Sequence, residues 1–172
     1  MRTRGAGGVV LVDRSGSMRF EPDDIQAILD AAPGCTVAGY SAITKGDPDP
    51  NLWVVAEHGR VASRLPKTPG GNGCDGPALD WAIAQRQHPS APIVWVCDGL
   101  VTGEGDLLSD ALTLECIDKV RRHRIVIVPH VREAIAALKA LQVGREPVRW
   151  TPPPFQALWT TIAGEELHLG SH

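Results

Sequence analysis

Short apolar runs alternate with helical patterns along most of this 172-residue chain, and this alternation limits the fold more than any other feature of the sequence. The runs are rich in Val, Ile and Trp, a composition typical of strands that are buried on both faces of a parallel sheet. Helical segments between such strands are typical of βαβ units. We therefore predict an α/β domain with a mostly parallel central sheet and helices on both faces.

The apolar runs predict a sheet of about six strands, at residues 9–13, 36–41, 52–57, 93–98, 125–128 and 148–150. Helices are expected in the segments PDDIQAILDA, DGPALDWAIAQR, DLLSDALTLECIDKVRR and VREAIAALKAL. In the second of these, Asp75 is the expected N-cap, because a short acceptor side chain satisfies free amides at a helix start. The link AITKGDPDPN is too short for a crossover helix, so the second and third strands should form an antiparallel hairpin at the sheet edge.

Chain length and composition limit how many domains the chain can form and which classes of partner it can bind. We predict one domain over residues 1–151, followed by a Pro-rich C-terminal segment, 152–172, with a short closing helix. The formal net charge of −3 gives no support for nucleic-acid or anionic-membrane binding. The N-terminal apolar run is too short for a signal peptide or a membrane span, so we expect a cytoplasmic protein.

The four cysteines are far apart, which argues against a zinc site and favours buried, reduced thiols.

Polar side chains follow two of the predicted strands at the point where each strand ends. Asp13 closes VVLVD and is followed by Ser15 and Ser17, while Asp98 closes IVWVCD. Functional groups gather at the carboxyl ends of strands in open parallel sheets. Carboxylate and hydroxyl oxygens suit a hard divalent ion such as Mg²⁺. The predicted metal ligands are therefore Asp13, Ser15, Ser17 and Asp98. In the alternative interpretation, the serines and Asp13 only cap backbone amides in a turn.

The string DRSGSM after an apolar strand, with VWVCDGLVTG further along, resembles the von Willebrand factor type A (VWA) domain and its metal-ion-dependent adhesion site (MIDAS). The resemblance implies a three-layer, Rossmann-like fold with one antiparallel edge strand. It also implies a protein-interaction module whose Mg²⁺ or Mn²⁺ ion binds an Asp or Glu of a protein partner. Family domains in Ala- and Arg-rich chains of this bacterial kind often belong to larger multi-protein assemblies.

The second loop departs from the family pattern. In GGNGCDGPAL the family's threonine position is occupied by Gly73, or by Cys74 if the alignment slips by one residue. Neither side chain offers a hard hydroxyl oxygen. Thr68 lies upstream and reaches the site only if the loop folds back. Two interpretations stay open, namely a metal site of weakened affinity and a metal-independent scaffold with a degenerate MIDAS.

Two further functions are weighed against a binding module. A metal-dependent phosphohydrolase needs a nucleophile or base beside the metal. The sequence around Asp13 and Asp98 offers no Asp-x-Asp pair, P-loop lysine or neighbouring histidine. We therefore do not expect an enzyme. The loop GGNGCDGPALDWA also loosely resembles the type A domain of Ro ribonucleoprotein particles. The helical-repeat part associated with RNA binding in those particles is not found in this sequence.

Overall fold

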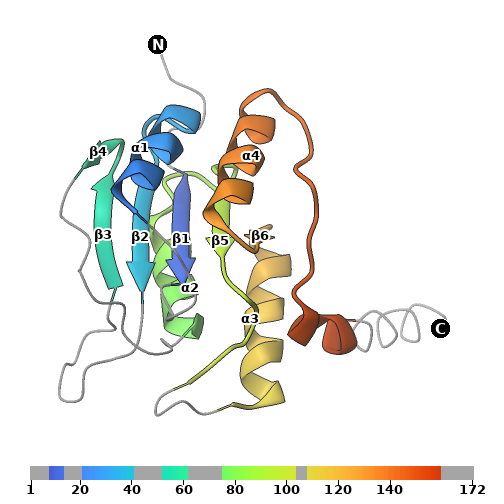
Figure 1. The fold of residues 1–172 in the computed structure, drawn as a ribbon. Helices are drawn as coiled ribbons and strands as arrows, with labels where there is room; N and C mark the ends of the chain where they lie inside the picture. The colour runs from blue at the N-terminus through green and yellow to red at the C-terminus, as the bar shows by residue number, and fades with distance from the viewer. Residues whose placement is uncertain (1–7, 14–20, 41–51, 62–74, 104–107, 160–172) are drawn as a thin grey trace.

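The computed structural model describes residues 8–13, 21–40, 52–61, 75–103 and 108–159, which form an α/β fold around a six-stranded sheet (Figure 1). The strand order is β4-β3-β2-β1-β5-β6. The strands are β1 (Val9–Asp13), β2 (Thr36–Tyr40), β3 (Leu52–Glu57), β4 (Arg60–Val61), β5 (Ile93–Val96) and β6 (Val126–Val128). The helices are α1 (Pro22–Ala31), α2 (Asp75–Gln85), α3 (Asp110–Arg122) and α4 (Val131–Gln142), and residues 153–159 are also helical.

Strand pairing confirms the mostly parallel sheet and its antiparallel edge. β1 pairs in parallel with both β2 and β5, and β5 pairs in parallel with β6. β2 and β3 form the predicted antiparallel hairpin. Beyond it lies β4, which the sequence did not predict because two residues carry no periodicity. His58 and Gly59 join β3 to β4, both with positive φ, as tight hairpin turns with the twist of a sheet require.

The strand predicted at residues 148–150 is wrong. These residues are neither helix nor strand, and Val148 is 88% exposed to solvent. Pro147 precedes them and Pro152 follows closely, and a proline has no backbone N–H to donate to a neighbouring strand. This three-residue segment between prolines therefore stays outside the sheet.

Alternate residues of each central strand face different helices, which explains why these strands read as continuous apolar runs. Val10 and Val12 lie in a core cluster with buried residues of α1 and α4. Val9 and Leu11 lie in a second cluster with buried residues of α2 and α3. Because successive side chains of a strand point to opposite faces, the two helix pairs cover opposite faces of the sheet.

Local signals set the helix starts. Glu21 caps α1 in a reciprocal capping box with Asp24, and Pro22 stands at the first helical position. Ser109 caps α3 by accepting a hydrogen bond from the Leu112 amide at 3.2 Å. None of the helices in the described ranges is long and apolar enough to cross a membrane.

The segment after α4 returns along the sheet to the edge where the parallel strands end. From residue 145 to 152 it has no helix or strand, and it descends in Figure 1 from the end of α4 to the lower edge of the fold. We call residues 150–159 the C-terminal strap. Its Phe155 is fully buried in the α2 and α3 cluster, with its ring centroid 6.2 Å from that of Trp95. Phe155 therefore anchors the strap in the hydrophobic core.

Candidate functional site

Two of the four predicted metal ligands emerge at the same edge of the sheet. β1 and β5 are adjacent and parallel, and Val12 lies opposite Val96 in their register. Asp13 ends β1, and Asp98 follows β5 by two residues, so both lie at the carboxyl edge, the lower edge in Figure 1. Asp13 is buried and Asp98 is exposed. Ser15 and Ser17 lie outside the described residues.

The loop after β5 holds the Asp98 carboxylate in a local turn. Asp98 Oδ1 accepts a hydrogen bond from the Leu100 amide at 2.9 Å, a bond that aspartate commonly makes two residues ahead in the chain. The residue between them, Gly99, has a φ of +83°, in the region that glycine adopts most readily. The orientation of Asp98 therefore depends on the conformation of this loop.

A third aspartate, Asp75, lies at the same edge and has a different role from the predicted N-cap. It is the first residue of α2 and is 2% exposed. Its carboxylate accepts hydrogen bonds from the Tyr40 hydroxyl at 2.5 Å and from the Thr102 amide at 2.9 Å. The Tyr40 oxygen in turn accepts a bond from Trp95 Nε1 at 2.9 Å. The carboxylate thus joins three elements across the core.

Sequence reasoning missed this network, although one signal pointed to it. Tyr40 is the chain's only tyrosine and ends a predicted buried strand. A buried tyrosine or tryptophan usually finds a hydrogen-bond partner for its polar atom. The rule predicts a hydrogen-bond partner for the Tyr40 hydroxyl. Which residue provides it depends on contacts between distant parts of the chain.

The charges of the three aspartates act on buried groups at this edge. The pKa of the Cys97 thiol is raised well above its usual value, first by burial and then by the charges of Asp75, Asp13 and Asp98. Burial raises the pKa of Asp75 to about 6; the charge of Asp98 acts in the same direction, and the hydrogen bonds from Tyr40 and Thr102 oppose the shift. The pKa of Tyr40 is raised well above its usual value, first by burial and then by the charges of Asp75 and Asp13. The carboxyl edge is therefore a region of concentrated negative charge.

This chemistry suits a divalent cation, but the described residues do not supply a complete coordination shell. Carboxylate oxygens are the ligands that Mg²⁺ and Mn²⁺ prefer. Within the described ranges, no group of three or more His, Cys, Asp or Glu side chains is arranged to hold a metal ion. An ion bound by Asp13 and Asp98 therefore needs further oxygen ligands, which Ser15 and Ser17 would provide.

The described cysteines behave as core residues, as predicted. Cys35, Cys97 and Cys116 are buried and form no disulfide. Burial raises the pKa of Cys35 to about 11 and that of Cys116 to about 12, so these thiols stay protonated at neutral pH. Cys74, together with Gly73 and Thr68, lies outside the described residues.

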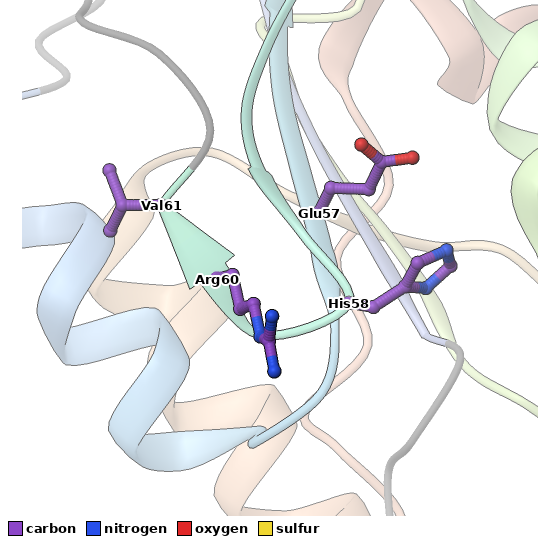
Figure 2. A pocket seen from close by; sticks show the side chains of 4 residues that line it. All are labelled: Glu57, His58, Arg60 and Val61. Carbon is purple, nitrogen blue, oxygen red and sulfur yellow. The ribbon is translucent and has the colours of Figure 1, made fainter.

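Two hollows in the described structure lie at the opposite edge of the sheet. One, of about 500 Å³, surrounds the turn between β3 and β4 and is lined by Glu57, His58, Arg60 and Val61. Figure 2 shows these side chains pointing in different directions from the hairpin and not toward a common point. The other, of about 330 Å³, is lined by apolar residues such as Ala32, Leu138 and Leu141. Neither hollow includes Asp13, Asp75 or Asp98.

Replacing Gly99 with alanine should lower the free energy of unfolding by about 2 kcal/mol, because alanine is strained at positive φ and its Cβ would overlap the ring of Pro152. Gly144 offers a matched control, with a φ of +73° and open space around the added Cβ. Gly144→Ala should cost only about 1 kcal/mol, the backbone term alone. Urea denaturation measures both values, and equal losses would contradict the contact with Pro152.

A scan of protein-family models matches no family to this chain, and a search of curated proteins finds no match. The function is therefore inferred from the chemistry of the residues at the carboxyl edge of the sheet.

Proposed function

We propose that this chain is a VWA-type domain that binds protein partners through a divalent metal ion at the carboxyl edge of its sheet. In this proposal Asp13, Ser15, Ser17 and Asp98 hold Mg²⁺ or Mn²⁺ in a MIDAS-like site. The observation that carries the proposal is the adjacency of β1 and β5, which brings Asp13 and Asp98 to one edge. The fold is then the three-layer, Rossmann-like arrangement of that family, supported by the helix pairs that cover opposite faces of the sheet.

The ligand chemistry explains why such a site would recognise a protein. Serine hydroxyls are neutral, so two carboxylates and two hydroxyls balance a divalent charge without exceeding it. An ion in this setting keeps positions for water that an Asp or Glu from a partner can take. The domain would then work as an interaction module within a larger bacterial multi-protein assembly, and not as an enzyme.

One observation favours a second function, a metal-independent scaffold. Both carboxylate oxygens of Asp75 accept hydrogen bonds from protein groups, Tyr40 and Thr102. Asp75 is therefore engaged in the core and is poorly placed to replace the threonine that the family carries where this chain has Gly73 or Cys74. If the remaining ligands are too few, partners would be bound by other surfaces of the domain.

Titration of Mg²⁺ into the chelator-treated protein, followed by calorimetry, tests the proposal. Asp13→Ala should weaken binding more than about 100-fold, because it removes a direct ligand and not an outer-shell group. Asp30→Ala is the matched control, since Asp30 is an exposed acid on α1 whose side chain accepts a bond from Gln26. Its affinity should equal that of the wild type, and melting temperatures would verify that both variants fold.

Two results would contradict the metal-dependent function. Retained binding in Asp13→Ala would mean that the ion binds elsewhere. Absence of heat from the wild type at millimolar Mg²⁺ would favour the scaffold function.

A further inference from the structure

The loop that carries Asp98 is held against the core on its inner side. The Thr102 amide donates to Asp75 Oδ2 at 2.9 Å, and the Asp75 amide donates to the Thr102 carbonyl at 3.4 Å. Thr102 is itself buried. This exchange of hydrogen bonds joins the far end of the loop to the start of α2. Asp98 lies four residues before Thr102, on the part of the loop that these bonds do not reach.

The C-terminal strap contacts that other part of the loop. A Cβ placed on Gly99 would overlap the Pro152 ring and lie 3.5 Å from Pro154 Cδ, so the strap prolines cover the Gly99 backbone directly. The Phe155 amide donates to the Pro152 carbonyl at 2.8 Å, which fixes the prolines relative to the buried Phe155 ring. The residue adjacent to Asp98 is therefore packed under a segment that is anchored in the core.

Phe155 of the strap is connected, through Trp95 and Tyr40, to Asp75, the residue that holds the inner side of the loop. Phe155 packs on Trp95, Trp95 donates to Tyr40, and Tyr40 donates to Asp75. A second contact secures the strap at its far end, where the Arg121 guanidinium of α3 lies 5.8 Å from the centroid of a Trp159 ring. The strap and Asp75 thus enclose the loop from two sides through one continuous set of contacts.

We propose that the C-terminal strap is a positioning element for Asp98, with Phe155 as its anchor and Pro152 as the residue that contacts the loop. Release of the strap would free Gly99 and allow the turn between Asp98 and Leu100 to open. The effect on an ion rests on the proposed function, because Asp98 is a ligand only there. The effect on the loop itself does not depend on a metal.

Phe155→Ala tests the inference in the full-length protein. In the metal-free variant, amide hydrogen exchange at Leu100 should rise about tenfold or more, because its acceptor is the Asp98 side chain. Mg²⁺ affinity should fall about tenfold, as for loss of a group that orients a ligand. Phe155→Leu, which keeps an apolar anchor, should largely restore both values.

Leu138→Ala is the matched control for lost stability. Leu138 is a large buried side chain, but it belongs to the cluster on the opposite face of the sheet. This variant should lose stability while leaving Leu100 exchange and Mg²⁺ affinity close to the wild type. Should Phe155→Ala fail to fold, Pro152→Gly serves as the second variant, because it removes both Pro152 ring atoms that lie against Gly99, Cβ and Cγ.

The possible outcomes separate this inference from the proposed function. Equal Leu100 exchange in Phe155→Ala and Leu138→Ala would overturn the positioning role, whether or not the protein binds Mg²⁺. Faster exchange in Phe155→Ala with unchanged Mg²⁺ affinity would overturn the role of the strap at the ion. Faster exchange in a protein whose wild type binds no Mg²⁺ would support the strap contact and overturn the metal-dependent function instead.

Discussion

Replacing Tyr40 with phenylalanine is expected to lower the free energy of unfolding by about 3 kcal/mol at neutral pH, although the change removes a single oxygen atom. That oxygen donates to the Asp75 carboxylate and accepts from Trp95 Nε1. Both partners are buried, so water does not readily replace the lost bonds. The cost is larger than that of an ordinary hydrogen bond because a buried charge and a buried N–H each lose a partner.

Urea denaturation measures this loss, and Thr113→Val provides its control. Thr113 is also buried, but its hydroxyl bonds to the Ser109 carbonyl within one turn of α3. No charged group loses a partner there, so the expected cost is below about 1 kcal/mol. A loss in Tyr40→Phe no greater than in Thr113→Val would show that the Tyr40 hydroxyl does not stabilise the buried carboxylate.

The stability of the protein should fall as pH rises through the range in which Asp75 ionises in the folded state. Its pKa is raised from 3.8 to about 6. Between these values the folded protein keeps a proton on Asp75 that the unfolded chain has released, so protonation favours folding. The contribution is fully present below pH 4 and is lost as pH rises through 6. The difference between these two pKa values corresponds to about 3 kcal/mol of the free energy of unfolding.

Comparison of the wild type with Asp75→Asn isolates this contribution. The other titrating groups are common to both proteins, so they largely cancel in the difference between the two stability curves. The asparagine side chain stays neutral at all these pH values. The free energy of unfolding of Asp75→Asn, relative to that of the wild type, should therefore increase by about 3 kcal/mol from pH 4 to pH 7. A difference that does not vary with pH would mean that Asp75 titrates alike in the folded and unfolded states.

The two predictions are coupled, because the Tyr40 hydrogen bond lowers the pKa of Asp75. Without that bond the carboxyl group should hold its proton to higher pH, so Tyr40→Phe should cost less at pH 5 than at pH 8. The hydrogen bonds around Asp75 explain how this aspartate can be part of the core, although it lies at the same edge of the sheet as Asp13 and Asp98, the proposed metal ligands.

Much of the fold follows from local patterns in the sequence. Apolar runs such as residues 9–13 and 93–98 predict strands covered on both faces, since helix pairs pack on alternate side chains. The short link after residue 41 predicts the antiparallel hairpin of β2 and β3. The same patterns place Asp13 and Asp98 at strand ends, and the adjacency of β1 and β5 then brings them to one edge. Periodicity and loop length are local properties, so a sequence displays them directly.

Only the tertiary structure decides which distant residues meet. Asp75 is a plausible helix cap until Tyr40 and Thr102 are found beside its carboxylate. Phe155 belongs to a Pro-rich segment that the sequence sets apart from the domain, yet it packs on Trp95 in the core. These contacts join residues far apart in the chain, and their energy comes from burial and hydrogen bonding that exist only once the sheet has formed. Local propensity therefore predicts the elements, while burial at the sheet edge determines which side chains position the site.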